Sequence, residues 1–438
     1  MADPAPDLSE VSYAAVSLDD GDLSPLALPK PPHPPIRHET AMDLAEAAEA
    51  TADYSTLLTE DISTQTSFGR AAIRLETPKP APVVVDEVDS GYAWNELPIV
   101  LSHYDLGSVK RIEAFKRGSR RAPKAVMLCD KGVFLLKRRE ATTETSQRIL
   151  VAHRVQKHLL AARYPTPALL PTRRSGSTLV HLNEHLYEMF TFVRSEPFDR
   201  SADAAGAAGR ALGLMHTILR DFPNPQDAPR GSFHQSPVVP RAFERAQETF
   251  SRVLSKASAG EGIANLNAIA KDLATIADVA DDLGAKDGVE RVCHGDWHPG
   301  NMLYNKERQV IGVVDYDSIR LQNPLFDLAN GALQFSAVGG SDPSKWPDDL
   351  DVTRLQAFMR GYAQESGVKP ATLRCIPWLM AEAMAVEVLL PVASRGAFAG
   401  IRGDLMMTVI RRKMKWLMSN AKLLHEAVEE ALGVENAW

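Results

Sequence analysis

Residues 294–301 read His-Gly-Asp-Trp-His-Pro-Gly-Asn, and residues 313–317 read Val-Val-Asp-Tyr-Asp. The two glycines and the proline of the first stretch predict a tight, non-helical loop. Asp296 and Asn301 lie on this loop, and Asp315 ends an apolar strand 19 residues after Asp296. With strands on both sides of the loop, we expect these three polar side chains to meet at one point.

Two carboxylates and one amide offer hard oxygen ligands, which suit Mg²⁺ better than zinc. One acid can hold the metal while the other accepts a proton from a hydroxyl group. A structural turn is the alternative, because Asp and Asn both favour turns. Three polar positions at this spacing favour the functional interpretation.

A dinuclear metallophosphatase is a second alternative, because residues 295–298 also fit the Gly-Asp-x-His start of that class. That chemistry requires further Asp, Asn and His ligands downstream. Asn301 comes too early for this, and no second histidine cluster follows Asp315 in the sequence. The metallophosphatase interpretation is therefore disfavoured.

The composition of the 438-residue chain narrows the class of protein. Its 45% hydrophobic content predicts a sizeable core, and no run of 18 apolar residues predicts a membrane span. A net charge of −7 argues against nucleic acid as a partner. The start of the chain does not read as a secretory signal, and the three cysteines (129, 293 and 375) lack CxxC spacing. We therefore expect a cytoplasmic protein without disulfides or a membrane partner.

The first 90 residues differ from the rest. They contain 17 acidic and 5 basic side chains, a net charge of −12, and 11 of the 29 prolines. Such a segment cannot bury enough apolar surface to offset its chain entropy. Residues 1–90 are predicted to be a disordered acidic, proline-rich tail, either a docking element for a protein partner or a solubilising extension.

The remaining chain predicts an α+β fold in two lobes. Residues 91–192 favour short strands around one helix, including a hairpin of strands 125–129 and 133–137 with a three-residue loop. Residues 193–438 are mostly helical, with Ser201 as an N-cap and a buried face at 208, 212, 215 and 219. A β insert is expected around residues 291–316.

The motif at 294–301, the strand ending in Asp315, and the Pro-x-x-Asp-Leu-Ala segment at 324–329 together resemble the aminoglycoside phosphotransferase/choline kinase family. Residues 100–107 and 135–139 are similar to the branch of type II homoserine kinases. The resemblance implies a protein-kinase-like fold, with a small β-rich N-lobe that binds ATP and a larger helical C-lobe with the catalytic loop.

The resemblance also implies roles for individual residues. Asp296 would orient and deprotonate the acceptor hydroxyl, while Asn301 and Asp315 would hold Mg²⁺ against the ATP phosphates. Lys137 would pair with the α- and β-phosphates, and the backbone near Thr191 and Val193 would bind adenine. The loop at 115–121, with a single glycine, occupies the place of the phosphate-covering loop. His294 is interpreted as a brace of the loop rather than a base, and His298 could serve either role, with the structural one favoured. Asp327 is interpreted as a residue that caps or anchors a helix.

One position departs from the family pattern. The helix glutamate that usually pairs with the strand lysine is not evident, because the expected window contains His153 and Gln156 and the nearest acid, Glu144, lies too early. Lys137 would then be positioned by Gln156 or by another acid.

The sequence therefore predicts an ATP- and Mg²⁺-dependent phosphotransferase for a hydroxyl-bearing small molecule, of the amino alcohol, hydroxy amino acid or amino sugar class. A nucleotide-binding pseudokinase that uses the tail for docking, or a kinase of protein hydroxyls, is the alternative. A set of acidic residues could favour a cationic acceptor, but solvated helix faces are the more common explanation, so no preference among acceptors follows. The set comprises Asp348, Asp349, Asp351, Glu382 and Glu387.

Overall fold

The computed structural model describes residues 92, 95–115, 122–223, 225–339 and 342–433. These residues form two compact units, one that ends at Arg194 and one that begins at Ser195. The predicted tail at 1–90 and most of the predicted phosphate-covering loop (116–121) lie outside the described residues. The two units are described separately below.

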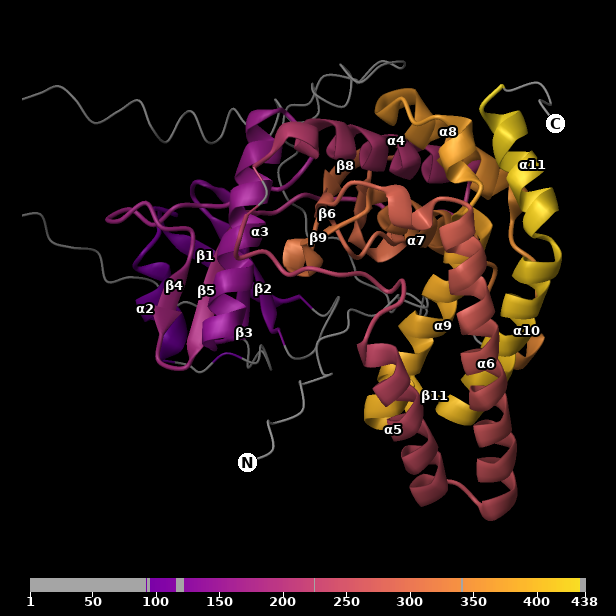
Figure 1. The fold of residues 1–438 in the computed structure, drawn as a ribbon. Helices are drawn as coiled ribbons and strands as arrows, with labels where there is room; N and C mark the ends of the chain where they lie inside the picture. The colour runs from indigo at the N-terminus through magenta and orange to yellow at the C-terminus, as the bar shows by residue number, and fades with distance from the viewer. Residues whose placement is uncertain (1–91, 93–94, 116–121, 224, 340–341, 434–438) are drawn as a thin grey trace, which may run out of the picture. The chain divides into compact units, whose positions relative to one another are not determined.

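The first unit is a five-stranded antiparallel sheet with strand order β1-β2-β3-β5-β4 (Figure 1). Its elements are α2 (Glu96–Leu101), β1 (Val109–Ala114), β2 (Lys124–Cys129), β3 (Gly132–Glu140), α3 (Thr143–Ala161), β4 (Val180–Leu182) and β5 (His185–Thr191). The predicted hairpin is β2–β3, but Cys129 pairs with Gly132, so its loop has two residues rather than three. The glycine therefore belongs to the ladder, not to the loop.

The two faces of this sheet carry different side chains because successive strand residues point to opposite sides. One face holds the apolar core of the unit, which includes Leu136 of β3 and Met189 of β5. The other face carries Lys137 and Glu188, which are opposite each other in the register of β3 and β5. Helix α3 packs over this polar face, where its His153 reaches Glu188.

The second unit is mainly helical, with short strands inserted between its helices. Its helices are α4 (Ala202–Ile218), α5 (Val238–Val253), α6 (Lys256–Asp282), α7 (Pro324–Ser336), α8 (Val352–Ser366), α9 (Ile376–Arg395), α10 (Gly403–Ser419) and α11 (Ala421–Ala431). Ser201 accepts a hydrogen bond from the amide of Ala204 (3.2 Å), which confirms the predicted N-cap of α4. The predicted core residues at 208, 212 and 215 of α4, and Leu219 directly after it, are at most 1% exposed.

The strands of this unit pair in three small sheets. They are β6 (Arg291–Cys293) with β9 (Arg320–Gln322), β7 (Met302–Tyr304) with β8 (Val310–Val313), and β10 (Ala397–Phe398) with β11 (Ile401–Arg402). The first two pairs form the predicted β insert, which places the 294–301 loop between β6 and β7.

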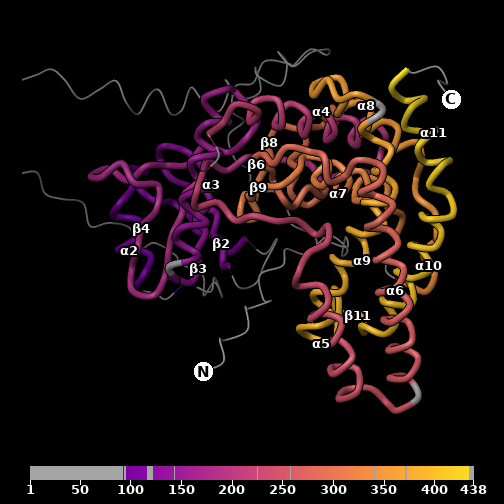
Figure 2. Tube along the Cα trace, in the orientation of Figure 1, coloured from indigo at the N-terminus to yellow at the C-terminus, as the bar shows by residue number. Residues whose placement is uncertain are grey.

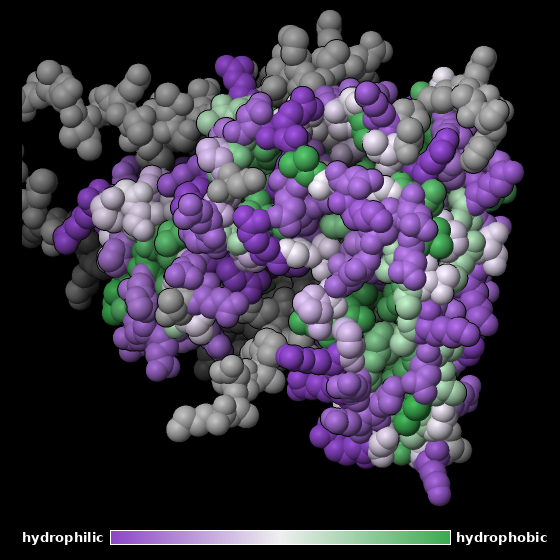
Figure 3. Space-filling model, viewed as in Figure 1, coloured by the Kyte–Doolittle hydropathy of each residue, from purple (hydrophilic) through white to green (hydrophobic). Residues whose placement is uncertain are grey.

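Helices α5 and α6 form a long helical hairpin, whose path can be followed in Figure 2. Figure 3 shows apolar side chains in the seam between these helices and mostly hydrophilic ones on their outer sides. Helix α9 packs against α5, α6, α7 and α10 and is long and apolar enough to cross a membrane. However, 89% of its apolar window is buried, as expected for the core helix of a folded domain.

Helices α4 and α8 cross with their backbones in contact, and glycine makes this possible. A Cβ atom on Gly209 would lie 2.0 Å from the carbonyl oxygen of Phe358, and one on Gly361 would lie 2.1 Å from that of Gly206. Because backbone atoms cannot move aside as a flexible side chain can, any side chain at these positions would push the helices apart.

We predict that Gly209→Ala lowers the stability of the protein by about 2 kcal/mol or more, as an overpacked core does. Thermal unfolding followed by circular dichroism measures the change. Gly260→Ala is the matched control, since nothing lies within 4 Å of a Cβ at this position of α6. The control should raise the midpoint slightly, because alanine favours a helix interior by about 1 kcal/mol over glycine. Equal midpoints for the two variants would contradict close packing at Gly209.

Candidate active site

The loop at 294–301 leaves strand β6, turns at Gly295 and closes with a 3₁₀ turn, Pro299–Asn301. Gly295 has φ +78°, and a Cβ there would lie 2.3 Å from the carbonyl oxygen of Ser318. Both the left-handed conformation and the close approach require glycine. The predicted tight loop is thus explained by its packing against the segment that precedes β9.

Asp296 and Asn301 meet within this loop. The Nδ2 group of Asn301 donates to the backbone oxygen of Asp296 (3.0 Å) and to its Oδ2 atom (3.2 Å). Asn301 is only 5% exposed, so its amide is held in one orientation. Because Nδ2 faces Asp296, Oδ1 is the atom of Asn301 that remains for a cation.

Asp315 is brought to Asn301 by the pairing of β7 with β8. Met302 is opposite Val313, so Asn301 directly before β7 and Asp315 shortly after β8 lie at the same end of the hairpin. The amide of Val314 donates to the backbone oxygen of Asn301 (3.0 Å), which fastens the two chain ends together. The structure therefore places the three predicted site residues of this unit in one neighbourhood.

Asp315 also has an unusual backbone. Its φ and ψ are 64° and 61°, in the left-handed region. Aspartate tolerates this region better than most residues, but the conformation still costs free energy and is concentrated at functional sites. The turn that follows, Tyr316–Ser318, leads the chain away to β9.

His298 supports the carboxylate of Asp296. Its Nδ1 atom accepts a hydrogen bond from the amide of Gly300 (3.0 Å), so Nε2 carries the proton that faces Oδ2 of Asp296 at 3.4 Å. Burial would lower the pKa of His298, but the charge and hydrogen bond of Asp296, with Glu387 and Asp315 nearby, raise it above its ordinary value. His298 thus helps to orient the proposed catalytic acid, a role the sequence did not reveal.

The carboxylate of Asp327, on α7, accepts hydrogen bonds from the start of the 294–301 loop. Its carboxylate accepts from the amides of His294 (2.7 Å) and Gly295 (2.8 Å) and from Nε2 of Gln322 (2.8 Å), with Nε2 of His216 at 3.4 Å. Burial would raise the pKa of Asp327, but these donors and the nearby histidines lower it, so the side chain is ionised. Of the two predicted roles, cap or anchor of a helix, the structure shows the anchor: Asn323 is the N-cap of α7, and Asp327 ties this helix to the 294–301 loop.

His294 and Cys293 complete this anchor. Nε2 of His294 donates to the carbonyl oxygen of Val314 (3.2 Å), which ties the loop to the segment between β8 and Asp315. Burial lowers the pKa of His294, so its ring is neutral. Burial also raises the pKa of the Cys293 thiol well above its ordinary value, and the thiol faces the carbonyl oxygen of Gln322 (3.6 Å).

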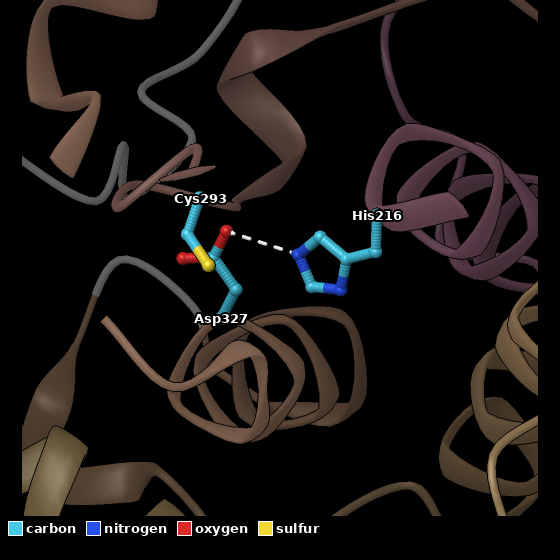
Figure 4. A group of neighbouring side chains, drawn as sticks. All are labelled: His216, Cys293 and Asp327. Carbon is cyan, nitrogen blue, oxygen red and sulfur yellow. Dashed lines mark hydrogen bonds and ion pairs between the residues drawn. The ribbon is translucent and has the colours of Figure 1, made fainter. Parts of the chain in front are cut away.

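Figure 4 shows His216, Cys293 and Asp327 converging from α4, β6 and α7. One potential ligand atom of each residue lies within 4.8 Å of those of the other two. This spacing is compatible with a metal ion, but the atoms already have partners. The carboxylate accepts several hydrogen bonds, and Nδ1 of His216 bonds the hydroxyl of Tyr362 (3.0 Å). Because these groups bond one another and their neighbours, the group is described as a buried hydrogen-bond network.

In the first unit, Lys137 is buried on β3, 6% exposed, opposite Glu188 of β5. Gln156 does not position it: its Nε2 group donates to Thr166 (3.2 Å) and to the backbone oxygen of Pro167 (2.8 Å). The acid beside Lys137 is therefore Glu188, which lies on a strand and not on the helix.

The predicted adenine-binding backbone lies at the end of β5. The amide of Thr191 donates to the carbonyl oxygen of Ala168 (2.9 Å), and its side chain accepts from the amide of Ala168 (2.9 Å). The amide of Phe192 donates to Val133 (2.9 Å). Of its backbone groups, Thr191 can therefore offer a nucleotide only its carbonyl. The amide of Val193 makes no hydrogen bond within the described part of the chain.

The acidic residues considered for an acceptor differ in their surroundings. Asp348 bonds a guanidinium on α10 (2.7 Å), Asp351 caps α8, and Glu382 accepts from an imidazole (2.6 Å). Asp349 is exposed. Glu387 of α9 is half-buried, bonds Gln334 of α7, and contributes to the raised pKa of His298. Of these acids, Glu387 is the one whose charge reaches the loop of Asp296.

The model of the family described as "Phosphotransferase enzyme family" matches residues 112–374. Among curated proteins, no sequence matches the chain.

Solved structures share the two-lobed, protein-kinase-like fold, which confirms the predicted fold class. An amicoumacin kinase in complex with AMP-PNP, Ca²⁺ and Ami has a TM-score of 0.55 and 13% identity, covering 74% of this chain and 93% of that chain. An aminoglycoside phosphotransferase from Alicyclobacillus acidocaldarius has the same score and identity, with coverage of 76% and 95%. A microcompartment-associated aminopropanol kinase has a TM-score of 0.51 and 13% identity, with coverage of 77% and 98%.

We predict that Asp327→Asn lowers the stability of the protein at pH 7 by about 3 kcal/mol. In the wild type, buried donors bond a charged carboxylate, whereas in the variant the side-chain NH₂ group of the asparagine would face some of these donors. The pKa of Asp327 is lower in the folded protein than the value of about 4 expected in the unfolded chain. The stabilisation by the ionised carboxylate is therefore complete above the unfolded-state pKa, and it is lost as the pH falls through the folded-state pKa. The stability difference between wild type and variant should therefore shrink below pH ~4.

Urea unfolding at pH 7 and at pH 3.5 measures both effects. Asp199→Asn is the matched control, because Asp199 is an ion-paired but 40% exposed acid of the same unit. Its effect should stay below about 1 kcal/mol at both pH values. If the control and Asp327→Asn were equally stable, the anchoring role of Asp327 would be rejected.

Proposed function

Because the chain belongs to the phosphotransferase enzyme family, we propose that it transfers the γ-phosphoryl group of ATP to a hydroxyl group of a small molecule. The observation that carries this proposal is the convergence of Asp296, Asn301 and Asp315 on one loop and one hairpin end. Phosphoryl transfer requires mainly positioning and neutralisation of charge, and this arrangement supplies groups for both.

The residues present fit Mg²⁺. Asp315 offers a carboxylate and Asn301 an amide oxygen, both hard ligands, and the orientation of Asn301 is held through its Nδ2 group. A bound Mg²⁺ would neutralise charge on the phosphates during transfer. Asn301 and Asp315 are therefore proposed as the metal-binding residues.

Asp296 is proposed to accept the proton of the acceptor hydroxyl. In the transfer, the hydroxyl oxygen bonds to the γ-phosphorus while the bond to the β,γ-bridging oxygen breaks and its electrons leave with ADP. The hydroxyl proton moves to the Asp296 carboxylate, whose Oδ2 atom is oriented by Asn301 and His298. In the first unit, Lys137 is proposed to bind the α- and β-phosphates, and the backbone at Thr191 and Val193 the adenine.

The acceptor is proposed to be a hydroxyl compound that also carries an amino group, such as an amino alcohol, a hydroxy amino acid or an amino sugar. Glu387 supports this class, since its carboxylate lies close enough to affect His298 and is half-buried. An ammonium group beside such a carboxylate would be favourable in a partly desolvated site. The aminopropanol kinase of similar fold acts on a molecule of this kind.

A nucleotide-binding pseudokinase is the second candidate, and one observation favours it. Helix α3 presents His153 and Gln156 where active relatives of the fold are expected to present a glutamate. Turnover distinguishes the two candidates. We also propose a reducing, cytoplasmic location, which the three unpaired, buried cysteines support.

We predict that Asp296→Asn lowers turnover by at least about 100-fold while Mg·ATP binding stays within a few-fold of wild type, because the proton acceptor is lost and the nucleotide contacts are kept. Asp315→Ala should instead weaken Mg·ATP binding. Purified protein is incubated with Mg·ATP and a panel of homoserine, choline, aminopropanol and amino sugars, and ADP release and labelled product are measured.

Asp278→Asn, an exposed acid on α6, is the control and should behave as wild type. Full activity of Asp296→Asn would remove its assignment. Tight Mg·ATP binding by the wild type without transfer to any acceptor would favour the pseudokinase, whereas label on a protein acceptor would favour a protein kinase.

A further inference from the structure

Glu188 is a buried acid directly opposite Lys137. The two residues pair in the register of β5 and β3, and they are 2% and 6% exposed. Opposite residues of an antiparallel pair lie on the same face with Cβ atoms about 5 Å apart. The side chain of Glu188 therefore shares its surroundings with the ammonium group of Lys137.

The partners of Glu188 keep it ionised. Oε2 accepts from Nε of Arg139 (2.8 Å), and Oε1 bonds Nε2 of His153 (3.0 Å). Burial would raise the pKa of Glu188, but Arg139, the hydrogen bond from His153 and the charge of Lys137 lower it below its ordinary range. An ionised carboxylate can only accept, so Nε2 of His153 carries the proton.

His153 connects this acid to helix α3. Its second ring nitrogen, Nδ1, bonds the hydroxyl of Thr178 (2.8 Å), so the ring is fixed at both ends and is only 3% exposed. Glu144, the acid in the first turn of α3, has a side chain that is 82% exposed and faces Arg148. His153 is thus the α3 side chain that reaches the acid beside Lys137.

We propose that Glu188 is the residue that positions Lys137 for nucleotide binding, and that His153 holds Glu188 in place of a direct acid from the helix. This inference rests on the proposed role of Lys137 as a phosphate-binding residue. Its structural consequence is that the lysine and its acid belong to two adjacent hydrogen-bonded strands. Their spacing is then set by sheet pairing and does not depend on how closely α3 docks.

The first test compares two equally conservative changes. Glu188→Gln removes the acid beside Lys137 and should weaken binding of Mg·AMP-PNP, measured by isothermal titration calorimetry, about tenfold. Glu96→Gln is the matched control. Glu96 is also buried, at 8%, and bonds the neighbouring β3 residue Arg138, but it does so on the opposite face. The control should lower the melting temperature and leave the Kd for Mg·AMP-PNP within about twofold.

A double-mutant cycle separates positioning from a general structural effect. If Glu188 acts through Lys137, Glu188→Gln should change the Kd less than twofold in a Lys137→Met background. Adding His153→Glu to Glu188→Gln returns an acid to this site from the helix, and the Kd should recover by at least threefold. Glu188→Asp replaces Glu188→Gln in the cycle if the amide variant does not fold.

The outcomes separate this inference from the proposed function. Wild-type protein that neither binds Mg·AMP-PNP nor turns over ATP contradicts the proposed function. Wild-type protein that binds, with Glu188→Gln and Glu96→Gln giving equal Kd values, contradicts only the role of Glu188. Additive effects of the Glu188 and Lys137 changes, or equal Kd values for Glu188→Gln with and without His153→Glu, also contradict it.

Discussion

The carboxylate of Asp327 is the point on which the candidate site depends. It bonds two successive amides of the 294–301 loop, a side chain of β9 and a histidine of α4, so one buried charge joins four segments. A buried carboxylate is tolerated only when its oxygen atoms accept enough hydrogen bonds, so the loss of a donor would cost stability. The backbone of the loop is therefore set before Asp296 meets any substrate, and preorganisation of this kind favours catalysis.

A second constraint acts from the opposite end of the loop. Asn301 bonds Asp296, while the amide of Val314 bonds Asn301, so the β7–β8 hairpin and the loop hold each other. Asp315 follows in a left-handed conformation that the hairpin and the next turn enforce. His294 crosses between these two segments through the carbonyl oxygen of Val314. Local strain at Asp315 is thus maintained by contacts on both sides.

In the first unit, buried charges on one face of the sheet balance each other. Its polar sheet face carries two basic residues, Lys137 and Arg139, around the single buried acid Glu188. Helix α3 adds a histidine instead of an acid, which avoids placing a second carboxylate beside the first. Two close buried carboxylates would repel each other, so an acid on the strand and an acid on the helix are alternatives. The departure from the family pattern is consistent with a relocated charge.

Much of the fold followed from local patterns in the sequence: the hairpin of β2 and β3, the Ser201 N-cap, the buried face of α4, and the loop that carries Asp296 and Asn301. Each depends on residues a few positions apart, where turn chemistry and helical spacing act directly. Only the tertiary structure decided the anchor role of Asp327, which lies 33 residues from His294 and 111 from His216, and the pairing of Lys137 with Glu188. Such contacts are set by how helices and strands pack, and no spacing along the chain encodes them.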